Sequence, residues 1–198
     1  MRLIRLPVKT ESLAKYSKIP ISFETVTQFQ IKVVKNGLGG IVLSEKPLKS
    51  ILKKDYDQLE EEGLTRWLKQ FDTSKWTIFF ALENDVIVGG AIVVLWTPGI
   101  RMFQGRQDIA LVWDIRVLPE WRRSGIGTKL FSRAVIWSKK NGCRFLKVET
   151  QNTNPSACKF YVKQGCQLGE INRFVYTDPR VIEETMLVWY RDLSDSIS

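Results

Sequence analysis

The 198-residue chain contains no histidine, and this absence excludes several kinds of chemistry. Without an imidazole there is no Ser-His or Cys-His pair to activate a nucleophile, so proton transfer falls to carboxyl, phenol, amine or thiol groups or to water. Cysteine is scarce as well, since the chain has only Cys143, Cys158 and Cys166. An odd number of cysteines without paired metal-ligand spacing argues against a zinc site, so we expect reduced and mostly buried thiols.

Long hydrophobic runs are also missing. No stretch approaches the roughly 18 uncharged apolar residues that a membrane span needs, and the first residues have no signal-peptide core. We therefore expect a soluble cytoplasmic protein without a membrane partner. The length and the hydrophobic content of 44% suffice for one ordinary core, and they predict a single domain over residues 1–198.

Positive charge is abundant and unevenly distributed. The net charge is +9, and the segment 107–165 alone holds 11 Lys and Arg residues against 4 Asp and Glu residues. A field of this sign favours a polyanion, either a phosphate-bearing cofactor or a nucleic acid. A basic surface that only improves solubility explains the same charge equally well.

The hydrophobic pattern is weak over residues 1–75 and clear over residues 76–190. Antiparallel strands are followed by strand, helix, strand, helix and strand, an order that predicts an α+β fold with a mixed, mostly antiparallel central sheet flanked by helices. The predicted strands are Arg2–Leu6, Phe23–Val34, one that starts at Ile41, Trp76–Leu82, Val86–Trp96, Ile109–Val117, Phe145–Gln151 and Thr185–Tyr190. The predicted helices are Thr10–Tyr16 capped by Thr10, Leu48–Phe71 interrupted near Gly63, Gly127–Trp137 and Pro155–Lys163.

Two predicted strands carry residues of special interest. Gly89 and Gly90 inside an apolar run suggest a bulge or a close backbone approach. In the strand Ile109–Val117, strict alternation places Asp114 and Arg116 on the same face as Ala110 and Val112.

A basic, glycine-containing loop, Arg122–Lys129, lies between a predicted strand and a predicted helix. The first N–H groups of a helix have no partners within the helix, and the helix dipole is positive at that end, so the loop is suited to bind a phosphate group. A Walker loop is excluded, because Gly127-Thr128-Lys129 is only a partial match. A dinucleotide fingerprint is excluded as well, because it needs three spaced glycines and a ribose-binding acid, whereas this loop has two glycines and is followed by basic residues.

What remains is the pattern Arg-x-x-Gly-x-Gly, formed by Arg122, Gly125 and Gly127. Together with Asn154, Ala157, Phe160-Tyr161 and Gly165 downstream, it resembles the GNAT N-acetyltransferase superfamily from Trp76 to Tyr190. The runs Glu149-Thr150-Gln151 and Ala157-Cys158-Lys159-Phe160-Tyr161 are similar to those of streptothricin acetyltransferases, a narrower likeness that begins at about Trp113. The chain departs from the superfamily at Cys166, where a phenylalanine is usual.

The resemblance implies acetyl-CoA as the cofactor. Glycines at 125 and 127 would let the backbone approach its pyrophosphate. The strand that ends at Ile115–Val117 would splay from its neighbour near Phe145 and pair with the pantetheine arm. Residues 76–190 would form the cofactor-binding core, and residues 1–75 would supply substrate-side elements. The implied cofactor contacts are Ile115, Val117, Arg122, Arg123, Ser124, Gly125, Ile126, Gly127, Thr128, Asn154 and Tyr161.

The resemblance also implies roles in catalysis. Tyr161 occupies the position of the general acid, although a core aromatic beside Phe160 is the alternative. Asn154 would contact the pantetheine arm or cap the helix that starts at Pro155, and the two roles are compatible. Glu149 is the preferred general base and Asp114 the second candidate. For each of them an ordinary ion pair, with Lys147 or Arg116 respectively, is the alternative.

These features predict direct acetyl transfer to a primary amine of a small molecule, with a streptothricin-like antibiotic as one candidate. The positive charge repels a cationic acceptor unless Glu149, Asp114 and the acids of Asp55–Glu62 form a local negative pocket. The alternatives are a protein lysine or N-terminal acetyltransferase, a non-catalytic acyl-CoA sensor and, less favoured, a nucleic-acid-binding domain. A homodimer is a further expectation, through an edge strand at Thr185–Tyr190.

Overall fold

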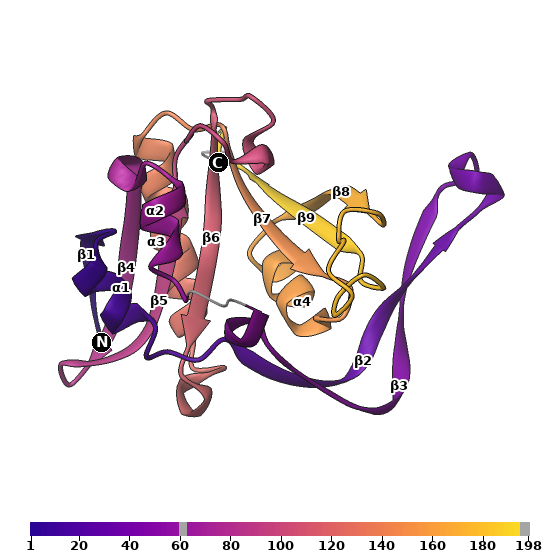
Figure 1. The fold of residues 1–198 in the computed structure, drawn as a ribbon, viewed down its shortest axis with the longest axis horizontal. Helices are drawn as coiled ribbons and strands as arrows, with labels where there is room; N and C mark the ends of the chain where they lie inside the picture. The colour runs from indigo at the N-terminus through magenta and orange to yellow at the C-terminus, as the bar shows by residue number, and fades with distance from the viewer. Residues whose placement is uncertain (60–62, 195–198) are drawn as a thin grey trace. The chain divides into compact units, whose positions relative to one another are not determined.

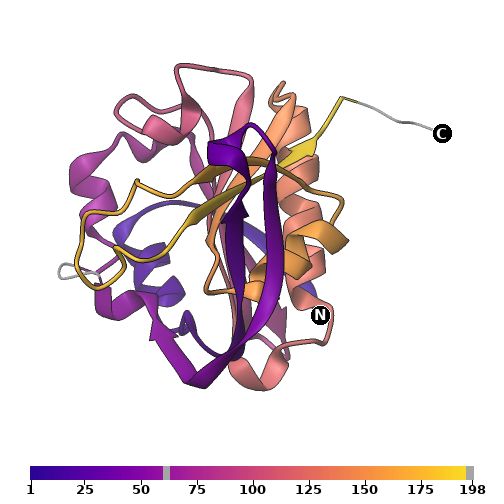
Figure 2. The same cartoon turned by 90° about the vertical axis from the view of Figure 1, so that its right-hand side faces the viewer.

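The computed structural model describes residues 1–59 and 63–194, which form two compact units. Unit 1 comprises Met1–Ser22, Asp55–Val148 and Tyr190–Ser198, and unit 2 comprises Phe23–Lys54 and Glu149–Trp189. Figures 1 and 2 show their elements from two directions. The predicted single domain stays a prediction, as does the division of roles at residue 75.

The sheet of unit 1 is mostly antiparallel. Its strands follow the order β1-β4-β5-β6-β7, in which β6 and β7 are parallel and the other pairs are antiparallel. At the β4–β5 hairpin, Asn84 and Asp85 both have positive φ, 47° and 62°, which the tight turns favoured in hairpins require. The strands are β1 (Arg2–Pro7), β4 (Trp76–Glu83), β5 (Val86–Val94), β6 (Ile109–Val117) and the start of β7 (Phe145–Gln151).

Helices cover both faces of this sheet. Helices α1 and α2 lie over one face and α3 over the other, as Figure 2 shows. The helices are α1 (Thr10–Tyr16), α2 (Arg66–Gln70) and α3 (Ile126–Lys140), with 3₁₀ turns at Tyr56–Leu59, Thr73–Lys75, Arg101–Phe103 and Pro119–Trp121. Helix α3 follows the predicted pattern, because its buried residues recur at helical spacing: Ile126, Leu130, Phe131, Ala134 and Ser138.

An aromatic cluster fills the core on the α1 and α2 side. The rings of Trp67, Trp76 and Trp113 lie with centroids 5.1–6.3 Å apart, and Phe71 packs against two of them. Tyr16 is fully buried in the same cluster. A Cβ at position 90 would lie 2.7 Å from the ring of Tyr16, so the predicted close approach at this glycine is confirmed.

Unit 2 combines a long hairpin with the second part of the α+β core. The hairpin pairs β2 (Ser22–Val33) with β3 (Ile41–Asp55), with a 3₁₀ turn at Lys35–Gly37. Its other strands follow the order β7-β9-β8, and α4 is its helix. Their bounds are Gln167–Asn172 for β8, Met186–Asp192 for β9 and Pro155–Lys163 for α4. The predicted α+β class with a mixed, mostly antiparallel sheet is confirmed.

The helix predicted over Leu48–Phe71 is wrong. Strand β3 continues to Asp55, and only Tyr56–Leu59 and Arg66–Gln70 are helical. The pairing of β3 with β2 stabilises an extended conformation and outweighs the local helical spacing. The predicted segment also includes residues 60–62, which lie outside the described residues.

The predicted faces of β6 are also wrong. Ile92 pairs with Asp114 but Val93 pairs with Val112, so Trp113 is an extra residue in a β-bulge. A bulge of this kind shifts the alternation by one residue. Asp114 therefore lies on the same face as Leu111, toward Tyr16 and not with Ala110 and Val112.

Two smaller predictions fail as well. The cap of α1 is Lys9, whose backbone N–H donates to the Ser12 hydroxyl at 2.9 Å, and Thr10 is already helical. Strand β9 is not an edge strand, because it lies between β7 and β8. The edge is β8, which the sequence pattern did not reveal, so the predicted dimer contact at Thr185–Tyr190 loses its basis.

Candidate active site

The phosphate-binding candidate is the turn that joins β6 to α3 in unit 1. Gly125 is the N-cap of α3 and has a left-handed backbone with φ of 87°, and Arg123 is left-handed as well, with φ of 62°. No atom outside its immediate neighbours lies within 4 Å of a Cβ built on Gly125, so the backbone is open at this point. The turn therefore presents the positive end of a 15-residue helix at an accessible surface.

Arg122 and Ser124 stabilise the shape of this turn. The Arg122 guanidinium donates to the carbonyl of Val117 at 3.1 Å and to the carbonyl of Ser22 at 2.8 Å. The Ser124 hydroxyl donates to the carbonyl of Trp121 at 2.6 Å. Arg122 therefore holds the turn against the end of β6, while the neighbouring Arg123 is exposed.

The end of β6 runs beyond its pairing with β7. The parallel ladder joins Ile109–Val112 to Phe145–Val148, whereas pairing with β5 continues to Val117. Ile115 and Val117 are half-buried in this extension. The backbone of this stretch is suited to accept an added partner, as the predicted pantetheine contact requires.

Asp114 lies in a buried ionic cluster of unit 1. Its carboxylate accepts two bonds from the Arg116 guanidinium, at 2.7 and 2.9 Å, and one from the Tyr16 hydroxyl at 3.1 Å. Arg116 also donates to Asp57 at 2.8 Å. Burial raises the pKa of Asp114 and the guanidinium opposes this. Burial alone would lower the pKa of Arg116, but the two carboxylates raise it above its usual range, so the guanidinium keeps its charge.

The contacts in this cluster bear on the predicted roles of Asp114 and Asp57. The alternative for Asp114, an ion pair with Arg116, is what the structure contains. Asp57, one of the acids expected to attract a cationic acceptor, is engaged by the same guanidinium. The glutamates of residues 60–62 lie outside the described residues.

Glu149 lies in a polar network of unit 2. Its Oε1 accepts a hydrogen bond from the Tyr176 hydroxyl at 2.7 Å and one from the Gln151 amide at 3.3 Å. The same amide donates to the Tyr176 hydroxyl at 2.9 Å. The predicted alternative partner, Lys147, donates to the carbonyl of Met102 at 2.9 Å. The Tyr176 hydroxyl and the Gln151 amide are thus two neutral donors to this carboxylate.

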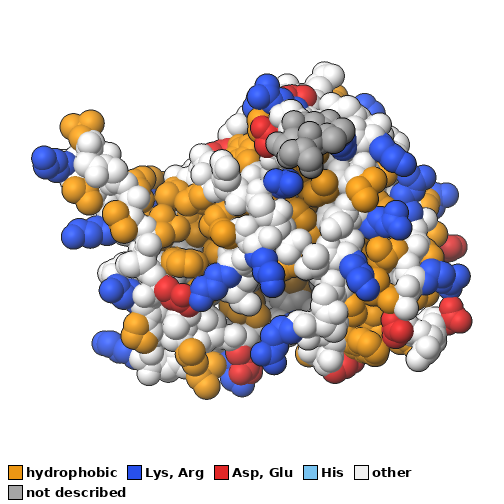
Figure 3. Space-filling view, turned by 180° about the vertical axis from the view of Figure 1, so that it is seen from behind, with side chains coloured by type: hydrophobic (Ala, Val, Ile, Leu, Met, Phe, Trp, Pro, Cys, Tyr) orange, Lys and Arg blue, Asp and Glu red, His pale blue; other side chains and the backbone are white. Residues whose placement is uncertain are grey.

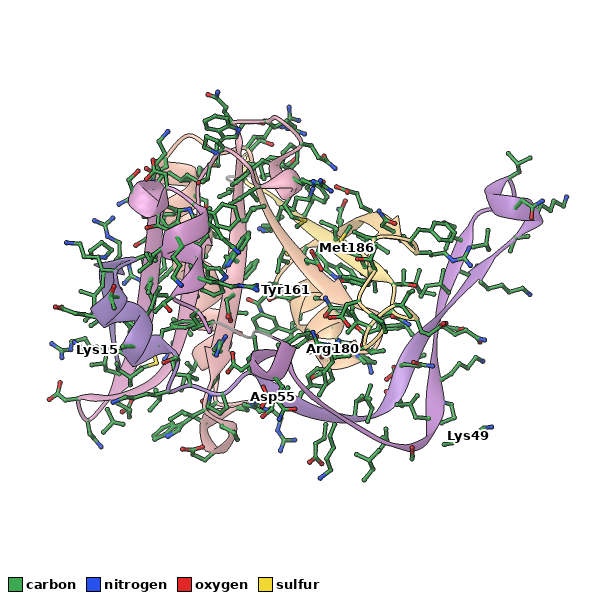
Figure 4. The ribbon with its side chains drawn as sticks, in the orientation of Figure 1. Lys15, Lys49, Asp55, Tyr161, Arg180 and Met186 are labelled. Atoms are coloured by element: carbon green, nitrogen blue, oxygen red, sulfur yellow. The ribbon has the colours of Figure 1, made fainter. Side chains whose placement is uncertain are left out.

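Helix α4 carries the other two predicted residues. The Asn154 side chain accepts from the Ala157 N–H at 3.0 Å, so the predicted cap is confirmed. Tyr161, labelled in Figure 4, is 4% exposed, and its ring meets Phe160 edge-on at 5.1 Å. The predicted aromatic contact is present, and the general-acid role of Tyr161 stays a prediction.

The predicted site residues are thus distributed over the two units. Asp114, Ile115, Val117 and the turn Arg122–Thr128 belong to unit 1, whereas Glu149, Asn154 and Tyr161 belong to unit 2. Their union in one site is a prediction. The sequence reading missed Tyr176, because Val175-Tyr176-Thr177 matches no motif and lies between β8 and β9.

A pocket of about 650 Å³ opens in unit 2, between β3 and the segment before β9. Its wall carries both charges: Lys49 and Arg180, which Figure 4 labels, and Glu183 and Glu184. Lys54 donates to Glu184 at 2.7 Å, and both side chains are about nine-tenths buried, at 9% and 12% exposure. The volume lies within the usual range for small-molecule sites, roughly 300–1,000 Å³.

Other kinds of site find little support in the described part of the chain. Residues 1–59 and 63–194 contain no helix that is long and apolar enough to cross a membrane, and no cluster of three metal-ligating side chains. The three cysteines are buried and free, as predicted. On the face shown in Figure 3, Lys and Arg side chains are interspersed with hydrophobic and neutral ones.

Comparison with known proteins gives consistent results. Residues 45–166 match the model of the acetyltransferase (GNAT) family. The chain is 37% identical over 136 residues to streptothricin acetyltransferase A of Bacillus subtilis strain 168, a match that covers 69% of this chain and 66% of that protein. It is 36% identical over 109 residues to a streptothricin acetyltransferase of Escherichia coli, covering 54% and 63%. The matches thus span slightly less than two thirds of these relatives.

A solved structure is similar over almost the whole chain. A crystal structure of a putative streptothricin acetyltransferase from Bacillus anthracis strain Ames, in complex with acetyl coenzyme A, has a TM-score of 0.72. The similarity covers 96% of this chain and 99% of that one, at 24% sequence identity. At this identity the likeness shows a common fold.

Proposed function

Because the chain belongs to the GNAT acetyltransferase family, we propose that it is an acetyl-CoA-dependent N-acetyltransferase that transfers the acetyl group directly to a primary amine. The observation that carries the proposal is the turn Arg122–Thr128, in which Gly125 opens the N-terminus of α3 in a left-handed conformation. Relatives named for streptothricin acetylation, one of them solved with acetyl coenzyme A, support it.

The residues present fit acetyl-CoA. A pyrophosphate needs several N–H donors and room for close backbone approach, and the open Gly125 at the start of α3 offers both. Exposed Arg123 and Lys129 add positive charge. The residues that would hold the group are Ile115, Val117, Arg122, Arg123, Ser124, Gly125, Ile126, Gly127, Thr128, Asn154 and Tyr161.

Acetyl-CoA supplies an activated acetyl thioester. The work left to the chain is to move protons, because the acceptor must reach the reaction as a neutral amine. In this proposal Glu149 takes the proton from the acceptor nitrogen, directly or through water. Tyr161 holds a phenolic proton for the departing sulfur. We prefer Glu149 to Asp114 for this role, because the Asp114 carboxylate is already engaged by Arg116 and by the Tyr16 hydroxyl.

We infer that the acceptor is a small molecule and that a streptothricin-like antibiotic is the first candidate. The relatives' names support this choice, and the pocket of about 650 Å³ in unit 2 supplies room for a molecule of that class. The carboxylate of Glu183 on its exposed rim offers an ion-pair partner for a cationic amine, although Lys49 and Arg180 lie on the same wall. Acetylation of a protein lysine or N-terminus is the competing activity.

An acceptor screen tests the proposal. The protein is incubated with acetyl-CoA and with a streptothricin, a polyamine or a peptide, while released thiol and acetylated product are measured. We expect thiol release and an acetylated antibiotic, both of which Glu149→Gln abolishes. Acetylation of the peptide alone would overturn the small-molecule assignment. Tight acetyl-CoA binding with no turnover on any acceptor would favour the non-catalytic sensor instead.

A further inference from the structure

Tyr176 belongs to the segment between β8 and β9, far in sequence from the motif that contains Glu149. Its hydroxyl makes two of the three hydrogen bonds in a closed triangle: it donates to Glu149 Oε1 at 2.7 Å and accepts from Gln151 Nε2 at 2.9 Å. The third side joins the Gln151 amide to the same Glu149 oxygen at 3.3 Å. Two donors thus converge on one carboxylate oxygen and fix its rotation.

The charges around this triangle keep Tyr176 in the donating state. Burial raises the pKa of the Tyr176 phenol, and the carboxylate of Glu149 raises it further, so the hydroxyl keeps its proton throughout the physiological range. Glu184 is the other carboxylate that acts on Tyr176, and Lys54 neutralises it at 2.7 Å. The phenol therefore donates to Glu149 and not to Glu184.

We propose that Tyr176, supported by Gln151, is a positioning residue that holds Glu149 as the proton acceptor for the substrate amine. The inference rests on the proposed function. In the step it serves, the N–H bond of the substrate ammonium breaks, the proton bonds to the Glu149 carboxylate, and the electron pair remains on the nitrogen for the attack. The aromatic side chain reaches Glu149 from a separate segment and thereby couples the base to the segment that forms the pocket wall.

The chemistry of the donors suits this role. A guanidinium partner stabilises the charged form of a carboxylate more strongly than a neutral donor does. A phenol and an amide are neutral donors, and each hydrogen bond stabilises the carboxylate only moderately. These two hydrogen bonds therefore orient the Glu149 carboxylate without placing a positive charge beside it.

Direct titration of Glu149 in the full chain tests the proposal independently of activity. The protein is labelled with ¹³C at the glutamate carboxyl carbons, and Glu149→Gln identifies the resonance. In Tyr176→Phe, which keeps the ring and loses the hydroxyl, we expect the Glu149 pKa to rise by about half a unit to one unit, since a donor to the charged form is lost. Tyr190→Phe, which removes a tyrosine hydroxyl in unit 1, is the control. An unchanged Glu149 pKa in Tyr176→Phe would overturn the proposal.

Kinetics on an accepted amine give the second readout. The base must be deprotonated, so the acidic limb of the kcat/KM profile should move to higher pH in Tyr176→Phe by the same amount as the carboxyl resonance, with the KM for acetyl-CoA unchanged. Gln151→Met, which removes the other donor, should shift both readouts in the same direction and serves if Tyr176→Phe does not fold. If the Glu149 resonance shifts but no amine is acetylated, the proposed function alone is refuted. If the enzyme is active but neither the Glu149 pKa nor the acidic limb of the kcat/KM profile shifts in Tyr176→Phe, the role of Tyr176 alone is refuted.

Discussion

The two carboxylates that the sequence offered as proton acceptors lie in different units and in opposite surroundings. In unit 1, Asp114 meets the Arg116 guanidinium at 2.7 Å and is almost fully buried, with a second carboxylate, Asp57, on the far side of the arginine. In unit 2, Glu149 meets a phenol and an amide. Arg116 places a positive charge beside the Asp114 carboxylate. The phenol and the amide orient the Glu149 carboxylate through neutral hydrogen bonds. Breaking a buried pair of the first kind is costly to the fold, and the proposed function gives the proton transfer to Glu149.

The largest expected effect follows from exchanging the two groups for their amides. Glu149→Gln keeps the shape and the acceptor for Tyr176 but removes the base, so kcat should fall by about 10²–10⁴-fold with little change in melting temperature. Asp114→Asn should do the reverse, lowering the melting temperature while the folded protein keeps most of its kcat. Steady-state kinetics and thermal unfolding of the two variants are the measurements. A similar loss of kcat in both variants would contradict the proposed difference in role between Glu149 and Asp114.

Removing the arginine from unit 1 gives the next effect. Arg116→Met leaves Asp114 buried without its cation, and should lower the free energy of unfolding by about 3–5 kcal/mol. Arg106→Met is the matched control, because Arg106 and Asp108 also approach to 2.7 Å but are exposed at the surface. Solvent screening makes that pair weak, so Arg106→Met should change the free energy of unfolding only slightly, as measured by denaturant titration. Equal losses would show that burial does not set the strength of these pairs.

A smaller effect is expected at the turn before α3. Gly125→Val forces a β-branched side chain into a left-handed backbone with φ of 87° at the proposed pyrophosphate site, and should weaken acetyl-CoA binding by about tenfold or more. Gly142→Val imposes the same kind of strain, at φ of 77°, just beyond the other end of α3. Both variants should lose stability, but only the first should lose affinity in calorimetric titration. If the two variants bound acetyl-CoA with equal affinity, the turn before α3 would not be the cofactor-binding site.

The ease with which each region could be predicted follows from how each is built. The turn Arg122–Lys129 and the cap at Asn154 are made of consecutive residues, so a short pattern contains most of their geometry. The strands of unit 1 were predictable for the same reason, since alternation and hairpin turns are local. A single extra residue, Trp113, was enough to reverse the predicted face of Asp114, because a bulge depends on the opposite strand.

The parts that could not be predicted are assembled from distant segments. Tyr176 lies 27 residues from Glu149 in the sequence, and Lys54 lies 130 residues from Glu184. The extended conformation of Leu48–Asp55 likewise depends on pairing with β2, whereas its spacing alone favoured a helix. Long-range contacts of this kind leave no local pattern, which is why these parts of the chain were harder to predict.

The smallest effect is expected from the thiols. Burial raises the pKa of Cys143 and of Cys158 to about 11, from an ordinary value near 9. At neutral pH the reactive thiolate is therefore about a hundredfold rarer than in an unfolded chain, and it becomes abundant only as the pH rises toward 11. Treatment of the folded protein with iodoacetamide at neutral pH should leave acetyl transfer unchanged, and mass spectrometry should find Cys158 unmodified. Rapid inactivation with alkylation of Cys158 would instead mean that a thiol takes part in the reaction, and that proton transfer by Glu149 is not sufficient to explain it.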